Sequence, residues 1–256
     1  MEKKEQLKIT YLHNSGIAIE KDELLIIIDY AMHTPGGRGE GLLSGIIPTD
    51  LIQKKSKVLV LVTHRHIDHY NKNILEWGDR FKNITYVFSD DIETDKDVIF
   101  ISCGECINVE GITIVACASN DEGVSFWLKV GEVTIFHAGD MSLWYWESEL
   151  GSKELKENRK AYRIAKTSYL KALESVKGLP VDIAFCPVNP QLGGNYSEGA
   201  MIFCKKIRPK LFVPVHFGLS FEVTEIYKET SNISGIEVWA IHERGDQFIY
   251  CPGNYE

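Results

Sequence analysis

The sequence lacks any long apolar run and any excess of positive charge. No stretch approaches the ~20 consecutive apolar residues of a membrane-spanning helix, and the amino-terminal segment has no apolar core of a secretion signal. The 256 residues carry 28 Lys and Arg against 36 Asp and Glu, giving a net charge of −8. Non-specific nucleic-acid binding needs a basic face, so we expect no nucleic-acid partner. Because the sequence has neither a membrane-spanning run nor a secretion signal, we expect no membrane partner and a cytoplasmic protein.

Cysteine is sparse and scattered, so the sequence offers neither a disulfide framework nor a complete thiolate metal site. The chain has 6 cysteines, and in a chain of this length without a secretion signal we expect them to be reduced. Cys103 and Cys106 have the spacing of a zinc knuckle, but no second pair completes four ligands. We interpret them as two incidental thiols in a turn.

Strand-like segments dominate the chain, with helical segments inserted between them and no repeat or linker. Paired strands are expected over 8–28, a Gly- and Pro-rich loop over 32–50, and helices near 71–77, 153–177 and 197–207. Further strands are expected at 58–62, 84–88, 97–101, 111–117, 124–130, 132–140, 181–187, 210–216, 236–241 and 246–251. This order predicts an α/β fold, a layered sandwich with two inner sheets, as a single domain over 1–256.

Three of the buried strand-like segments end in residues of metal-ligand type. KVLVLV runs into THRHIDH, EVTIFHA runs into Gly139-Asp140, and KLFVPV runs into His216. Because strand ends lie along one edge of a sheet, side chains just beyond them can converge in a cleft.

The strongest of these signals is the hexad 64–69. It holds three of the chain's 8 histidines together with Asp68. Burying so many polar groups without a partner would cost several kcal/mol, whereas imidazole and carboxylate ligate zinc, manganese or iron well. The hexad therefore predicts a metal site. We interpret the isolated His33 and His242 as ordinary core or surface residues, and His137 as a supporting or structural residue.

The hexad His64-x-His66-x-Asp68-His69 resembles the HxHxDH signature of the metallo-β-lactamase superfamily. Gly139-Asp140 and Val215-His216 resemble the later bridging aspartate and last histidine of that family, in the same order, and Asp29 resembles an aspartate that supports the metal loop. The resemblance extends from about residue 8 to about residue 250. It implies a four-layer αββα sandwich with one or two divalent metal ions at the rim between the sheets. The segments SNDEGVSF and FHAGD are most similar to a bacterial branch of lactonase-type and uncharacterised hydrolases.

The resemblance also implies a ligand set, with zinc as the first expectation and manganese or iron as alternatives. One metal would be held by His64 and His66, the second by Asp68, His69 and His216, with Asp140 bridging both.

The sequence departs from the family at one position. A further histidine is expected between the hexad and Gly139-Asp140, but the segment 118–123, ASNDEG, contains none. Asp121 or a water can take its place. The first metal is then expected to bind weakly, to prefer a harder ion such as manganese, or to be absent.

The resemblance implies hydrolysis of a small-molecule ester, lactone or phosphoester by a metal-activated water, with Asp68 both ligating the metal and orienting the water. The alternatives are a phosphodiesterase or nuclease of the same superfamily, or a non-catalytic metal- or ligand-binding protein. The sequence leaves the substrate and the oligomeric state open.

Several other residues have two interpretations at this stage. Trp144 and Trp146 form either an aromatic wall of the pocket or a packing contact against the sheet. Arg38, in the Gly-rich segment 35–45 that can close over a ligand, either meets an anionic group or is solvated. His13, His137 and Asp29 support the metal ligands or the substrate, or are structural.

Overall fold

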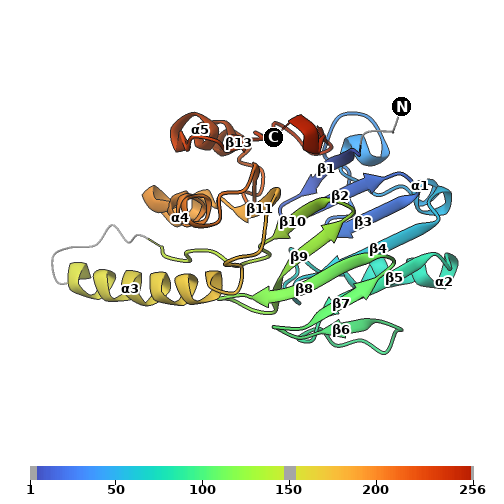
Figure 1. The fold of residues 1–256 in the computed structure, drawn as a ribbon, viewed down its shortest axis with the longest axis horizontal. Helices are drawn as coiled ribbons and strands as arrows, with labels where there is room; N and C mark the ends of the chain where they lie inside the picture. Colours follow the sequence, from blue (N-terminus) through green and yellow to red (C-terminus); the bar gives the residue numbers. More distant parts are fainter. Residues whose placement is uncertain (1–4, 147–153, 255–256) are drawn as a thin grey trace.

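The computed structural model describes residues 5–146 and 154–254, which form two stacked sheets with helices on the outer faces (Figure 1). The first sheet runs in the order β14 (Gln247–Tyr250), β1 (Leu7–His13), β2 (Gly16–Lys21), β3 (Leu24–Ile28), β4 (Lys57–Val62), β5 (Ile84–Ser89) and β6 (Ile99–Ile101). The second runs in the order β13 (Glu237–Val238), β12 (Leu211–Val215), β11 (Ile183–Pro187), β10 (Val133–His137), β9 (Val124–Val130), β8 (Ile112–Ala118) and β7 (Cys106–Val109).

Five α-helices lie in the described part of the chain: α1 (Thr49–Lys54), α2 (Glu76–Arg80), α3 (Glu154–Leu173), α4 (Glu198–Ile207) and α5 (Glu222–Ser231). The first two pack on the outer face of the first sheet, and the other three pack against the second. This arrangement confirms the predicted αββα sandwich. Within the described residues, no helix is both long and apolar enough to cross a membrane.

Strand β4 shows why the sequence has continuous apolar runs rather than alternating apolar and polar residues. Leu59 and Leu61 point into the core between the two sheets, whereas Val58 and Val60 point outward and pack in the cluster that contains Ile52 of α1. Successive side chains of a strand face opposite sides, so a strand covered on both faces needs apolar residues at every position.

The parallel parts of the two sheets place the functional segments at one rim. β3 and β4 are parallel, and so are β10, β11 and β12. Asp29 follows β3, the hexad follows β4, Asp140 follows β10 and His216 follows β12. Two backbone hydrogen bonds join the sheets at this rim, from His216 N–H to Asn14 O (3.0 Å) and from Val124 N–H to Thr63 O (3.0 Å).

The structure differs from the predicted elements in a few places. Helices α1 and α5 and strand β7 were not predicted, and the expected loop 32–50 contains a 3-10 turn (Gly41–Ser44) and the start of α1. The helix predicted over 153–177 ends at Leu173, followed by turns to Gly178, and residue 153 lies outside the described residues. Cys103 and Cys106 are free, exposed thiols, with Cys106 opening β7.

Candidate metal centre

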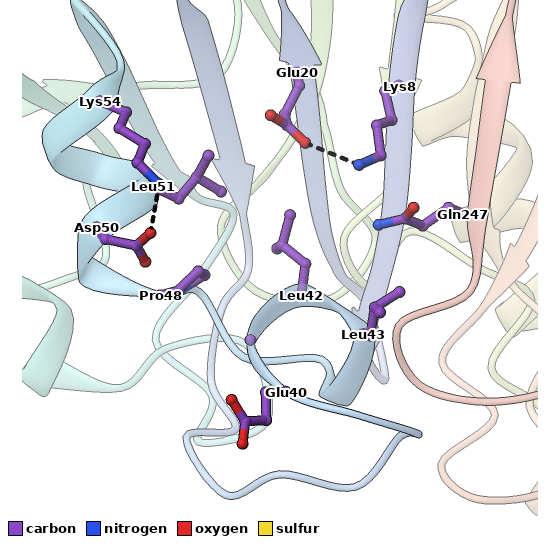
Figure 2. Close-up of a pocket in the computed structure, with 11 residues that line it drawn as sticks. Lys8, Glu20, Glu40, Leu42, Leu43, Pro48, Asp50, Leu51, Lys54 and Gln247 are labelled. Carbon is purple, nitrogen blue, oxygen red and sulfur yellow. Dashed lines mark hydrogen bonds and ion pairs between the residues drawn. The ribbon is translucent and has the colours of Figure 1, made fainter.

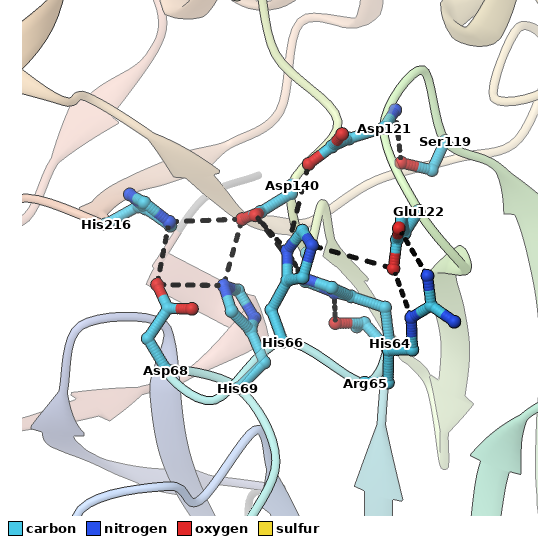
Figure 3. Close-up of polar contacts among 12 residues, drawn as sticks. His64, Arg65, His66, Asp68, His69, Ser119, Asp121, Glu122, Asp140 and His216 are labelled. Carbon is cyan, nitrogen blue, oxygen red and sulfur yellow. Dashed lines mark hydrogen bonds and ion pairs between the residues drawn. The ribbon is translucent and has the colours of Figure 1, made fainter. Parts of the chain in front are cut away.

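The six predicted ligand residues come together at the rim between the sheets (Figure 3). They form two groups, within each of which the candidate ligand atoms lie within 4.8 Å of one another. The first half-site consists of His64, His66 and Asp140, and the second half-site consists of Asp68, His69 and His216. This grouping is the one that the family resemblance implied; the role of these residues as ligands stays a prediction.

Asp140 connects the two half-sites because its two carboxylate oxygens face different groups. Oδ2 lies 3.3 Å from Nε2 of His64 and 3.7 Å from Nδ1 of His66, whereas Oδ1 lies 2.9 Å from Nε2 of His69 and 3.2 Å from Nε2 of His216. The side chain is almost fully buried. The preceding Gly139 has a φ of 53°, and a Cβ there would lie 2.9 Å from the Thr63 side chain, so this approach requires glycine.

Two buried atoms of this cluster make no hydrogen bond to each other, and both are suited to bind a metal ion. Nε2 of His69 and Oδ1 of Asp140 have no hydrogen-bond partner among the described residues, although they lie 2.9 Å apart. A buried polar atom without a partner costs free energy, and imidazole nitrogen and carboxylate oxygen are both ligands for divalent transition metals. The residues at this rim therefore fit one or two such ions.

Asp29 and Thr63 determine which histidine nitrogens face the centre. Oδ1 of Asp29 accepts from the Thr63 backbone N–H (2.8 Å), and Oδ2 accepts from the Thr63 hydroxyl and from Nδ1 of His69 (both 2.8 Å). The Thr63 hydroxyl donates its only hydrogen to Asp29, so at 2.9 Å it accepts the hydrogen on Nδ1 of His64. The Nε2 atoms of His64 and His69 are thereby left free to bind a metal.

The carboxylates make the centre strongly favourable for positive charge. Burial alone would lower the pKa of His69, but the charges of Asp29 and Asp140 outweigh it and raise that pKa to about 10. Burial would raise the pKa of Asp140, but its contacts with His64 and His69 hold the pKa well below its usual range. The environment that favours a proton on His69 equally favours a metal cation in its place.

The second half-site includes a residue that sequence reasoning missed. Asn14 donates from Nδ2 to Oδ2 of Asp68 (2.9 Å), and Nε2 of His216 lies 3.3 Å from the same oxygen. The contact with His216 lowers the pKa of Asp68 to about 2, against an opposing effect of burial. Thr63 was missed as well. The turn sequence Asn14-Ser15-Gly16 and the position of Thr63 before the hexad were the available signals.

Three residues of this rim adopt left-handed backbone conformations although they are not glycine. The φ angles are 51° at Asn14, 50° at Asp29 and 60° at His216. Such conformations cost about 1–3 kcal/mol each and persist where the surrounding structure enforces them, most often at functional sites. Here each one directs a side chain from a strand end toward the centre.

Asp121, which the sequence offered in place of an expected histidine, lies beside the first half-site. Its Oδ2 is 4.0 Å from Nδ1 of His66. Burial, and then the charge of Asp140, raise its pKa.

The remaining predicted supporting residues fall into two classes. Asp29 contacts a candidate ligand directly. His137 uses both ring nitrogens elsewhere: Nε2 bonds to Ser15 O (2.8 Å) and Nδ1 accepts from Gly139 N–H (3.2 Å). It is therefore structural. His13 precedes Asn14 and belongs to neither half-site, and burial lowers its pKa to about 4.

Trp144 and Trp146 form an aromatic wall beside the second half-site. The Trp144 ring meets His216 edge-on, with centroids 5.3 Å apart, and its Nε1 donates to Asp140 O (2.5 Å). Trp146 stacks on Trp144 with centroids 6.0 Å apart and is 60% exposed. The pair therefore faces the centre on one side and solvent on the other.

The Gly-rich segment 35–45 has a structural role away from the six candidate ligands. Arg244 fixes it by donating to Thr34 O (2.7 Å) and Gly45 O (3.1 Å), while Arg38 pairs with Glu243 at 3.1 Å. Its side chains line a groove of about 520 Å³ that contains none of the candidate ligands (Figure 2). Of the two interpretations of Arg38, the structure favours the solvated one.

Comparison with known proteins gives consistent results, although no protein-family profile matches the chain. The chain is 24% identical over 228 residues, 82% of each chain, to a UPF0173 metal-dependent hydrolase of Ignicoccus hospitalis. The structure of Igni18, a metallo hydrolase from the same archaeon, superposes with a TM-score of 0.64 at 19% identity, covering 96% of this chain and 98% of that one. The metallo-β-lactamase fold protein YhfI of Bacillus subtilis gives 0.59 at 14% identity, covering 96% and 100%.

These structural similarities establish the fold, and the hexad lies where that fold brings its two sheets together. The chain therefore has the metallo-β-lactamase-type fold that its sequence predicted, and it is similar to metal-dependent hydrolases with this fold.

Proposed function

We propose that the protein is a metal-dependent hydrolase of a small-molecule ester, lactone or phosphoester. The observation that carries the proposal is that two adjoining clusters of histidine and aspartate side chains both face the buried carboxylate of Asp140. The donor set suits zinc first, with manganese or iron as alternatives. Metal ions held by these residues would lower the pKa of a bound water toward about 7 and polarise a carbonyl or phosphoryl oxygen.

Asp68 is the residue best placed to act on the attacking water. Its side chain is 46% exposed, and Asn14 and His216 hold its Oδ2 in place. Because its pKa is about 2, Asp68 is ionised at neutral pH, and it would accept a hydrogen bond from an attacking water rather than store its proton. Asp68 would therefore orient the water, while the buried Asp140 would fix the spacing of the two half-sites.

A small substrate is favoured over a nucleic acid. The chain has a net charge of −8, and Arg65 beside the centre is engaged by Glu122 through two contacts of 2.7 and 2.8 Å. A polyanion would therefore meet a repulsive surface. Trp144 and Trp146 offer a flat apolar surface against which an uncharged part of a small substrate can pack.

The test is a substrate screen on protein stripped with chelator and reloaded separately with zinc, manganese or iron(II). The substrates are p-nitrophenyl acetate, a series of γ-lactones, p-nitrophenyl phosphate, bis(p-nitrophenyl) phosphate and single-stranded DNA and RNA. We expect metal-dependent turnover of a small substrate, lost in Asp68→Asn and retained in Asp50→Asn, a matched change on the exposed helix α1.

Each other outcome of the screen supports one alternative. Cleavage restricted to DNA or RNA would replace the proposal with a nuclease. A fully loaded protein that turns over none of these compounds would indicate a non-catalytic metal-binding protein.

A further inference from the structure

The loop 119–123 lies in the segment where the resemblance implies a histidine that the sequence lacks, and one side of the loop is tied to the segment that carries Asp140. Asn120 exchanges two hydrogen bonds with the backbone of Ser142, from Nδ2 to Ser142 O (2.8 Å) and from Ser142 N–H to Oδ1 (3.1 Å). Ser142 is two residues beyond Asp140. The loop is therefore held in register with the bridging aspartate.

The other side of the loop is docked on the strand end that carries His64. A Cβ on Gly123 would lie 2.1 Å from Thr63 O and 2.6 Å from His64 Cβ, so only glycine permits this approach. The next residue, Val124, donates its N–H to Thr63 O (3.0 Å). The loop is thus fixed against both segments that supply the first half-site.

The two acidic residues of the loop meet opposite nitrogens of His66. Asp121 Oδ2 lies 4.0 Å from Nδ1, and Glu122 Oε2 lies 3.5 Å from Nε2. Nδ1 is the nitrogen that faces the centre, because it lies 2.9 Å from Nε2 of His64 and 3.7 Å from Asp140. Asp121 therefore approaches the ring nitrogen that faces His64 and Asp140, and Glu122 approaches the other nitrogen (Figure 3).

The separation between Asp121 and His66 suits two ligands of one ion. Ligand atoms that bind zinc at about 2.0–2.2 Å each can lie at most about 4.4 Å apart. The 4.0 Å between Asp121 Oδ2 and His66 Nδ1 is within that limit. Glu122 is committed elsewhere, since Arg65 holds both of its oxygens at 2.7 and 2.8 Å.

We propose that Asp121 replaces the missing histidine as a metal ligand of the first half-site, whereas Glu122, whose carboxylate is held by Arg65, does not bind the metal. This inference rests on the metal centre of the proposed function. With Asp121 included, both half-sites have the same donor set: two imidazoles, one carboxylate of their own and one oxygen of Asp140. The first half-site is then a complete site with an additional negative charge, not a degenerate one.

The test is the metal content of wild type, Asp121→Asn, Asp121→His, Glu122→Gln and Asp140→Ala. Each protein is loaded with zinc or with manganese, desalted and analysed by elemental mass spectrometry, and chelator competition gives the affinity of the weaker site. We expect about two equivalents of metal in wild type and about one in Asp121→Asn, with the affinity of the weaker site lowered at least ~10-fold.

Asp121→His should restore two equivalents of zinc and favour zinc over manganese, because imidazole suits zinc and carboxylate suits manganese. Glu122→Gln should keep two.

The variants separate failure of this inference from failure of the metal centre. Suppose that Asp121→Asn keeps two metal equivalents at wild-type affinity while Asp140→Ala loses both. This result would overturn the role of Asp121 and leave the metal centre in place. Loss of one equivalent in Glu122→Gln but not in Asp121→Asn would reverse the two assignments. Wild type that binds neither metal would remove the centre itself, together with the proposed function. Circular dichroism of each variant checks that it is folded.

Discussion

The two half-sites use the same kinds of side chain but are held in place by different parts of the molecule. In the second half-site, His69 is fully buried and fixed by Asp29, and Asp68 is fixed by Asn14. In the first, His66 is 40% exposed, and the adjacent loop reaches it from the surface. The second half-site therefore depends on the core, whereas the first depends on loop contacts. We expect the second to retain its metal longer when a chelator is present.

Asp140→Ala should have the largest effect, because both half-sites face this one carboxylate. We expect the bound metal to fall from about two equivalents to near zero, and any hydrolysis to be lost with it. Elemental mass spectrometry measures this directly. One tightly bound ion remaining in the variant would show that the half-sites are independent.

Asp29→Asn should affect the two half-sites differently, because it weakens the buried second half-site. The amide would place its NH₂ group against the Thr63 hydroxyl and Nδ1 of His69, both of which donate to Asp29. Breaking this buried interaction should cost about 3 kcal/mol of unfolding free energy in metal-free protein, measured by urea titration. We expect the second half-site to lose its metal before the first.

Asp182→Asn is the matched control for Asp29→Asn. Asp182 accepts the backbone N–H and the hydroxyl of Thr134 at 2.7 and 2.8 Å, a pattern like that of Asp29 with Thr63, but it is not in contact with the centre. The Asp182→Asn change should lower the free energy of unfolding and leave the metal content unchanged. Equal metal loss in both variants would mean that Asp29 acts through general stability alone.

Asn14→Gly should affect the second half-site without destabilising the backbone. Glycine adopts the φ of 51° without strain, so the change removes only the hydrogen bond to Asp68. We expect an affinity loss of about 10–100-fold for one of two metals, as measured by chelator competition. Asn232→Gly, at a φ of 36° after helix α5, is the control. Unchanged affinity in Asn14→Gly would remove Asn14 from the centre.

Trp146→Ala should have the smallest effect and should leave both half-sites loaded. The side chain is largely exposed and touches Trp144 rather than a candidate ligand. Once a substrate is found, we expect KM to rise a few-fold with kcat unchanged, because the wall contributes uniform binding. A fall in kcat of similar size would place Trp146 closer to the reacting atoms.

The sequence predicted the layers and the candidate ligands because these depend on local patterns. Strand β4 could be recognised from its unbroken apolar run, and the ligand residues from their position just after such strands. Helix α5 was not predicted, because its sequence EVTEIYKETS has a short apolar face and many polar residues. Its stability comes from packing against the second sheet, which no local window contains.

The supporting contacts around the centre could not be predicted for the same reason. Asn14 is 54 residues from Asp68, and the two meet only because the sheets are stacked. The difference between Asp121 and Glu122 depends on which nitrogen of one histidine each approaches. Neighbouring acidic residues in a loop do not reveal that difference in sequence, because the direction of each side chain is set by contacts with Ser142, Thr63 and Arg65.

The pairing of β14 with β1 has a consequence for synthesis of the protein. Leu7 pairs with Tyr250 across this edge, so the first sheet cannot gain strand β14 until residue 250 has left the ribosome. The centre has a similar delay, because His216 comes late in the chain and its backbone is held by Asn14 near the start. Contacts so distant in sequence form slowly. The second half-site is therefore complete only after β12 has packed beside the turn that carries Asn14.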